Sequence, residues 1–422
     1  MSKKDNRAIK KMSVEPYKGV RDFYPEDQAL LQYFIDTCRA VAEKVGYVEY
    51  GASVLEPSEL YKNKNAENEE IINEQTYTFT DRGGREVTLR PEMTPTVARM
   101  VAGRRREFGF PLRLYCVPNF FRYERPQRGR LREFWQLNVD LFGSNSPAAD
   151  AEVLAVAYGL MAAFGARESD FVIKVGSRQA IQAITQENNL DEEQTKKFFA
   201  LLDRRAKISE VDFDLQLKEF GINKSLLSPQ NVPQDIAKMI ADFAEAGINN
   251  IVYDPSVVRG FAYYSGMVFE VFDTHPDNGR AIFGGGRYDN LTALFDDEPL
   301  PGVGFGMGYE TMRLFMESRG LLPAYTPPTQ VYFAVTAPDL ALQAQTLAGG
   351  LRRGGVNAAV DFGERKLGDQ IKAAAKNKIP WLIVVGEDEL ASGRFKVKNL
   401  ASGAEETVAE ADLPQFFLNL KS

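Results

Sequence analysis

The chain has 422 residues, 44% of them apolar and 26% charged, which is typical of a globular protein with roughly two or three domains. No apolar run approaches the ~18 residues of a membrane span, and residues 1–11 are polar and lysine-rich, unlike a secretory signal. The two cysteines lie far apart, which argues against a disulfide framework and favours the cytoplasm. The single histidine argues against a Ser–His–Asp triad and a histidine-based zinc site. The net charge of −7 disfavours non-specific coating of nucleic acid.

The N-terminal part of the sequence predicts helices mixed with antiparallel strands. Residues 1–14 are predicted to form a disordered tail. Apolar residues at helical spacing predict a helix over 26–45, and alternation predicts one strand over 47–57. Thr, Tyr and Phe alternate before a Gly-Gly turn in 76–90, and the alternation resumes after it with Val87 and Leu89, which is a strong hairpin signal.

The middle of the chain predicts a sheet interrupted by helices. A helical stretch at 91–107 precedes short strands over 112–142, and an alanine-rich helix is expected at 148–165. The stretch 177–247 is helical and polar and lies between two sheet-like regions. We therefore predict an inserted helical subdomain there.

The C-terminal third predicts a second domain. The sheet pattern resumes from 251 to 308, and a proline-rich linker follows at 321–329. Beyond it, strands and helices alternate regularly, which indicates a small α/β domain with a mostly parallel sheet. We expect a catalytic domain over 15–325 and the smaller domain over 326–422.

Five arginines lie within eleven residues between two predicted strands: Arg122, Arg125, Arg128, Arg130 and Arg132. A run of charges is usually only a solvated loop. Arginine, however, offers the bidentate donors that phosphate accepts, and Phe134 nearby could stack on a base. From these residues alone, a solvated loop and a nucleotide-binding loop both remain open.

Two acidic positions are candidates for binding a small cation or an N–H donor. Glu92 follows Pro91 and precedes Thr94, so it either favours the start of a helix or anchors a substrate ammonium group. Gln136 and Asp140 lie four residues apart and therefore share one face of a predicted strand. A buried carboxylate there would select a ligand that carries an N–H donor.

Two further segments contain candidate ligand-binding residues. Arg259 precedes Tyr263 and Tyr264, and in a strand these tyrosines would point to opposite faces, one into the core and one to the surface. The glycine cluster at 283–291 lacks the Lys-Ser/Thr of a P-loop, so it is a weak signal, with Tyr288 as its polar candidate.

Together these segments resemble the histidyl-tRNA synthetase family of class II aminoacyl-tRNA synthetases. The FRYE…F segment is similar to motif 2, and the resemblance implies ATP contacts at Arg122 on the α-phosphate, Glu124 and Phe134 on adenine, and Arg130 near the phosphates. The longer form RPQRGRLREF resembles the histidine enzyme in particular. It implies that Arg125 and Gln127 contact tRNA.

The resemblance also assigns a histidine site. LRPEMT implies that Glu92 and Thr94 hold the α-amino group, and the segment around Arg259 implies that this arginine replaces a metal as the catalytic cation. The remaining histidine-binding residues that the resemblance implies are Gln136, Asp140 on the imidazole N–H, Tyr263, Tyr264 on the imidazole, and Tyr288 of GGRYD.

The sequence departs from the family at two positions. Ala262 stands where the family usually has Asp. In motif 3, Thr311 stands where the family has the Arg that grips the ATP γ-phosphate. Arg313 is two residues on, about 200° round a helix, so it is expected to face away, and Arg130 or Arg259 would have to replace the missing charge.

The resemblance implies an α+β fold: an antiparallel-sheet catalytic domain with a helical insertion, plus a C-terminal anticodon-binding-like domain. It implies a homodimeric cytoplasmic enzyme that ligates L-histidine to tRNA(His) through histidyl-adenylate, using ATP with Mg²⁺ and no bound zinc or membrane. The alternative is a non-ligating paralogue that binds histidine and regulates a partner. Thr311 and Ala262 favour this alternative, whereas the intact motif 2 loop and the C-terminal domain oppose it.

Overall fold

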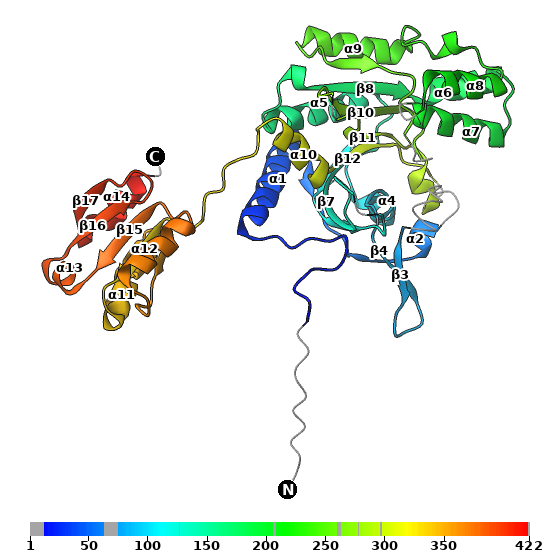
Figure 1. Cartoon of the computed structure of the whole chain (residues 1–422). Coiled ribbons are helices and arrows are strands. Elements are labelled where there is room, and N and C mark those ends of the chain that lie inside the picture. Colours follow the sequence, from blue (N-terminus) through cyan, green and yellow to red (C-terminus); the bar gives the residue numbers. More distant parts are fainter. Residues whose placement is uncertain are drawn as a thin grey trace. The chain divides into compact units, whose positions relative to one another are not determined.

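The computed structural model describes residues 12–62, 75–125, 127–205, 208–259, 263–276, 278–295 and 298–420 (Figure 1). The chain divides into two compact units between Pro323 and Ala324. Most of the predicted N-terminal tail lies outside the described residues. None of the helices in the described parts is long and apolar enough to cross a lipid bilayer.

A nine-stranded sheet forms the centre of the first unit. Its strands run in the order β1-β5-β7-β12-β11-β10-β8-β9, with β6 paired to β7. From β5 to β8 every pairing is antiparallel, and parallel pairs occur only at the two edges. The strands are β1 Val48–Glu49, β5 Leu112–Cys116, β6 Asn119–Phe121, β7 Glu133–Phe142, β8 Phe171–Ser177, β9 Ile251–Tyr253, β10 Met267–Asp273, β11 Ala281–Arg287 and β12 Gly302–Gly308.

One face of this sheet is apolar and carries the main core. Leu137, Val139 and Leu141 alternate along β7 and are completely or almost completely buried against helices of the unit. These helices are α1 Pro25–Lys44, α5 Pro147–Ala163, α9 Gln234–Glu245 and α10 Tyr309–Ser318. Because side chains alternate across a strand, the intervening polar residues of β7 are left for the opposite face.

A smaller sheet lies in the same unit. It has the order β2-β4-β3, from β2 Leu55–Pro57, β3 Tyr77–Thr80 and β4 Glu86–Leu89, with α2 Glu59–Lys62 and α4 Thr94–Gly103 nearby in sequence. The β3–β4 hairpin agrees with the prediction and extends away from the main sheet (Figure 1). The prediction of one strand over 47–57 is wrong, because the segment splits into β1 and β2, which belong to different sheets.

The described residues between β8 and β9 form helices and no strand. The first three helices, α6 Arg178–Glu187, α7 Glu192–Asp203 and α8 Glu210–Glu219, surround a separate apolar cluster that contains Ile181 and Phe198. The fourth helix, α9, instead buries Met239 and Phe243 in the main core. The helical stretch therefore contributes both a satellite cluster and one helix of the central layer.

The second unit has a five-stranded sheet in the order β14-β13-β15-β16-β17. Two pairings are parallel and two antiparallel, so the prediction of a mostly parallel sheet holds only for β13–β15. The elements are β13 Val331–Val335, α11 Ala341–Arg353, β14 Ala358–Val360, α12 Leu367–Lys376, β15 Trp381–Val385, α13 Glu387–Ser392, β16 Arg394–Asn399, β17 Glu405–Ala409 and α14 Leu413–Asn419. Short 3-10 turns occur at Arg105–Glu107, Glu168–Asp170, Lys224–Leu227, Leu291–Leu294, Pro338–Leu340 and Glu410–Asp412.

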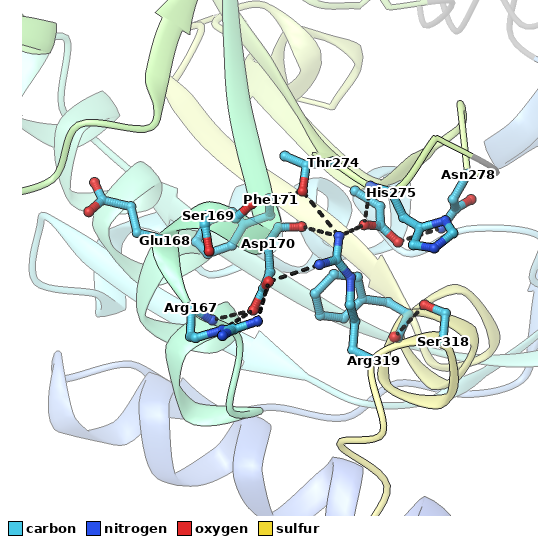
Figure 2. A network of polar contacts seen from close by, with 12 residues as sticks. Arg167, Glu168, Ser169, Asp170, Phe171, Thr274, His275, Asn278, Ser318 and Arg319 are labelled. Carbon is cyan, nitrogen blue, oxygen red and sulfur yellow. Dashed lines mark hydrogen bonds and ion pairs between the residues drawn. The ribbon is translucent and has the colours of Figure 1, made fainter.

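A network of ion pairs fixes the end of α10, where the first unit ends (Figure 2). Arg319 donates to the Asp170 Oδ1 at 2.8 Å, to the Thr274 Oγ1 at 3.0 Å and to the Asp273 carboxylate. Both aspartates are buried, so their charges need compensation, and Arg319 pairs with both of them. Arg167 holds Asp170 from the other side. The network ties β8, β10 and α10 together just before the linker.

Candidate active site

A cavity of about 140 Å³ lies on the polar face of the main sheet. Its floor comes from β7, β11 and β12, and its walls from the start of α4, the end of β6 and the segment before β10. The lining residues are Glu92, Thr94, Arg122, Gln136, Asn138, Asp140, Arg259, Tyr263, Tyr264, Gly284, Tyr288, Gly304, Phe305 and Gly306. Nine of the residues singled out in the sequence meet here, although they come from segments far apart in the chain.

Alternation along β7 supplies three polar side chains to the cavity. Gln136, Asn138 and Asp140 all line it, and the Gln136 Nε2 donates to the Asn138 Oδ1 at 2.8 Å. Asn138 was not predicted, although it lies between two residues that the same alternation had selected. The strand therefore presents a row of hydrogen-bonding groups to a ligand.

Asp140 is the buried acid of the site. Its side chain is 3% exposed, and its Oδ1 accepts the phenolic hydrogen of Tyr288. The second oxygen, Oδ2, is buried without a hydrogen-bond partner. Burial raises the pKa of Asp140 to about 7, although the Tyr288 hydrogen bond acts in the opposite direction. A buried acceptor without a partner is costly, so this oxygen favours a ligand that brings an N–H donor.

Glycines in β11 and β12 make room for these side chains. A Cβ on Gly304 would lie 2.7 Å from the Asp140 Oδ1, and one on Gly306 would lie 2.4 Å from the Gln136 Nε2. A Cβ on Gly284 would lie 2.3 Å from a guanidinium nitrogen of Arg259. Separations below 3 Å cannot be accommodated without movement, so these glycines are needed for space.

Glu92 faces the cavity at the start of α4. The N-cap of this helix is Met93, and no side chain caps it, so the alternative that Glu92 and Thr94 form a cap-like arrangement is wrong. Burial raises the pKa of Glu92, while the charge of Arg122 and a hydrogen bond from Tyr263, 3.5 Å from the Glu92 Oε2, act to lower it. A carboxylate in this position can bind an ammonium group.

Tyr263 and Tyr264 lie before β10 and not within a strand. Both line the cavity, with ring centroids 4.9 Å apart, so the alternative of a strand with one tyrosine in the core and one on the surface is wrong. The alternation rule applies only to extended strands, and this segment is irregular. Ala262, the departure noted beside them, lies outside the described residues.

Arg259 brings a cation into the cavity. Its backbone has a φ of 52°, an uncommon conformation for a residue with a side chain. Its guanidinium lies 3.3 Å from the Glu270 Oε1 and 5.8 Å from the centre of the Tyr264 ring, and its Nε is buried without a hydrogen-bond partner. The side chain is therefore only partly satisfied within the protein and can bind an anion.

The loop between β6 and β7, residues 122–132, is called the arginine loop here. Arg122 lines the cavity, donates from its Nε to the Pro91 carbonyl at 2.8 Å and stacks 5.3 Å from the Phe134 ring centre. Glu124 lies 4.0 Å from Arg122 and 3.4 Å from the guanidinium of Arg130, which is 57% exposed. A row of charged side chains therefore extends from the cavity to the surface, formed by Arg122, Glu124 and Arg130.

The other members of the arginine loop have different surroundings. Arg125, Gln127 and Arg128 are exposed. Arg132 is only 8% exposed, donates to the Glu124 carbonyl at 3.2 Å and lies 3.9 Å above the Tyr123 ring. Arg132 therefore supports the base of the loop and is a structural residue, a distinction that the sequence did not reveal.

Motif 3 contributes no charge to the cavity. The Thr311 hydroxyl donates to the Gly308 carbonyl at 3.0 Å. Arg313 pairs with Glu310 at 3.1 Å and with Glu317 at 3.3 Å. Arg313 is not among the residues that line the cavity, in agreement with the prediction that it faces away.

Comparison with known proteins places both units. A family model described as histidyl-tRNA synthetase matches residues 19–213 and 228–312, and one described as anticodon binding domain matches residues 330–420. A protein named histidine–tRNA ligase from Leptospira biflexa is 37% identical over 414 residues, covering 93% of this chain and 94% of that protein. One of the same name from Thermoplasma volcanium is 34% identical over 428 residues, covering 96% and 98%.

Solved structures agree with this comparison. The crystal structure of histidyl-tRNA synthetase from Nostoc sp. PCC 7120 matches with a TM-score of 0.82 and 25% identity, covering 97% of this chain and all of that chain. The structure of apo S. aureus histidyl-tRNA synthetase matches in fold with a TM-score of 0.72 at 24% identity, covering 96% and 100%.

Proposed function

The chain belongs to the histidyl-tRNA synthetase family, and from this membership together with the cavity we propose that it is an ATP-dependent ligase that joins L-histidine to tRNA(His). The observation that carries the proposal is the unpaired, buried Oδ2 of Asp140, in a cavity that also contains Glu92 and Arg259. Asp140 can accept a hydrogen bond from a ring N–H, Glu92 can bind an ammonium group, and Arg259 can bind an anion. Histidine and ATP together carry these three groups.

In the proposed binding mode the amino acid lies along β7. Glu92 and Thr94 hold the α-ammonium group, and Asp140 accepts the imidazole N–H. The remaining residues proposed to contact histidine are Gln136, Tyr263, Tyr264 and Tyr288, all of which line the same cavity. Tyr288 orients Asp140 through its hydroxyl, which leaves the other carboxylate oxygen for the ligand.

Activation needs no general base in this scheme. The histidine carboxylate is already an anion, and its oxygen attacks the ATP α-phosphorus while the bond to pyrophosphate breaks. Negative charge builds up on the α-phosphate oxygens, where Arg259 and Arg122 stabilise it. Glu124 and Phe134 are proposed to hold adenine, and Arg130 the outer phosphates. Mg²⁺ enters as part of the ATP substrate complex.

Transfer completes the reaction. A terminal ribose hydroxyl of tRNA(His) attacks the histidyl carbonyl, and AMP leaves. Arg125 and Gln127 are exposed on the arginine loop, as contacts to the acceptor end require. The C-terminal unit, which matches the anticodon binding family, would bind the other end of the tRNA. We further propose a homodimer that works in the cytoplasm.

Histidine-dependent ATP–pyrophosphate exchange tests this proposal. Exchange with histidine alone among the twenty amino acids, and its loss in Arg259→Ala, is the expected result. The comparisons do not favour the regulatory paralogue, although Thr311 removes the motif 3 cation. Histidine binding without any exchange would favour that paralogue over the ligase.

A further inference from the structure

The tip of the arginine loop is a tight turn that requires glycine. Gln127 and Arg130 exchange backbone hydrogen bonds of 3.2 and 2.9 Å, which closes a four-residue turn. Gly129 occupies its third position with a φ of 80°, the left-handed conformation that type II turns need there. The shape of the tip is therefore set by the local sequence.

This tip packs against the first turns of α10. A Cβ on Gly129 would lie 3.3 Å from the Leu314 Cδ1 and 4.0 Å from the Thr311 Cγ2. Thr311 and Leu314 are three residues apart in the helix, so they share one face. The Thr311 hydroxyl donates to the Gly308 carbonyl, which fixes the side chain while its methyl faces the loop. We call Thr311 and Leu314 the loop seat.

The loop seat determines where the neighbouring charge lies. Arg130 follows Gly129 directly and pairs with Glu124, which in turn lies beside Arg122 in the cavity wall. The one cation of α10, Arg313, is bound to Glu310 and Glu317 instead. At this end of the site the available positive charge therefore comes from the loop and not from the helix.

We propose that Thr311 and Leu314 are positioning residues that seat the loop tip, so that the arginine loop supplies the charge that an arginine at position 311 would otherwise carry. An arginine side chain leaving position 311 in the direction of the Thr311 methyl would run into Gly129. In that direction an arginine and the seated loop tip would compete for the same space, so threonine complements this loop rather than being a simple loss. The inference rests on the proposed use of ATP.

Equilibrium ATP binding in Thr311→Arg tests the seat. We expect about tenfold weaker ATP binding by calorimetry, the size of one lost charge-assisted contact, with unchanged histidine binding and thermal stability. Leu314→Ala should weaken ATP binding a few-fold in the same way. Arg128→Lys, which keeps the charge of an exposed neighbour in the same turn, is the matched control and should leave ATP binding unchanged.

A double variant tests whether an arginine at position 311 can replace Arg130. Arg130→Gln should weaken ATP binding, and adding Thr311→Arg should not restore it. If Thr311→Arg binds ATP as well as or better than the wild type, or rescues Arg130→Gln, the proposal that Thr311 and Leu314 position the loop is refuted. A wild type that binds ATP and histidine but shows no exchange refutes the ligase and leaves the seat intact. A wild type that does not bind ATP refutes both.

Discussion

Replacing Asp140 with asparagine should weaken histidine binding by about 10- to 150-fold. The new side-chain amide can still accept from Tyr288 through its oxygen, but its NH₂ group then replaces the Oδ2 that has no partner in the protein. A donor would meet the ligand N–H, and a charge-assisted hydrogen bond of about 1.5–3 kcal/mol would be lost. ATP binding should be unaffected.

The same change should raise the stability of the ligand-free protein. An ordinary Asp titrates near pH 4, whereas burial raises the pKa of Asp140 to about 7. The folded protein therefore holds a proton that the unfolded chain releases, and keeping the ionised carboxylate buried costs stability. This cost is absent below about pH 4, grows as the pH rises to about 7, and reaches about 4 kcal/mol above that. The Asp140→Asn variant avoids the cost, so its free energy of unfolding should increase by at most this amount.

Calorimetric titration with histidine and urea unfolding at pH 5.5 and pH 8 would measure both effects. The ratio of wild-type to variant affinity should increase through about pH 7, because titration of histidine itself cancels in the ratio. A variant that loses affinity and stability together, or a ratio that does not change with pH, would show that Asp140 mainly supports the fold through Tyr288.

Three further variants test the roles of Arg259, Gly304 and Arg319. Arg259→Lys should lower the rate of histidine-dependent exchange by about 10²–10³ with little change in histidine affinity, since it removes stabilisation of charge that develops during the reaction. An equal loss of rate and affinity would contradict this role. Gly304→Ala should lower the free energy of unfolding by about 1–3 kcal/mol and impair histidine binding, because its Cβ would lie 2.3 Å from the Val139 carbonyl oxygen and 2.7 Å from the Asp140 Oδ1. Gly159→Ala, whose Cβ would lie 3.6 Å from the nearest side-chain atom, is the control for thermal melts and should be tolerated. Arg319→Ala should cost about 3–5 kcal/mol in urea unfolding, since it leaves two buried aspartates without their shared partner, and the exchange constants of the folded enzyme should be unchanged.

Much of the fold could be predicted from the sequence because its signals are local. Helical spacing predicted α1 and α5, and alternation around a Gly-Gly turn predicted the β3–β4 hairpin. The segment 47–57 failed because alternation indicates extended backbone but not which sheet a strand joins. The change from β1 to β2 depends on partners at least thirty residues away.

The sequence by itself identified the residues that are proposed to carry the chemistry. Residue type and spacing made Glu92, Asp140 and Arg259 candidates, and the family resemblance gave them their expected roles. Alternation alone put Gln136 on the same face as Asp140. Only the tertiary structure decided that these groups share one cavity, that both tyrosines before β10 face it, and that one oxygen of Asp140 is left for a ligand. The physical reason is that periodicity is a property of neighbours along the chain, whereas burial, pKa and unpaired atoms depend on the strand order and register that bring distant segments together.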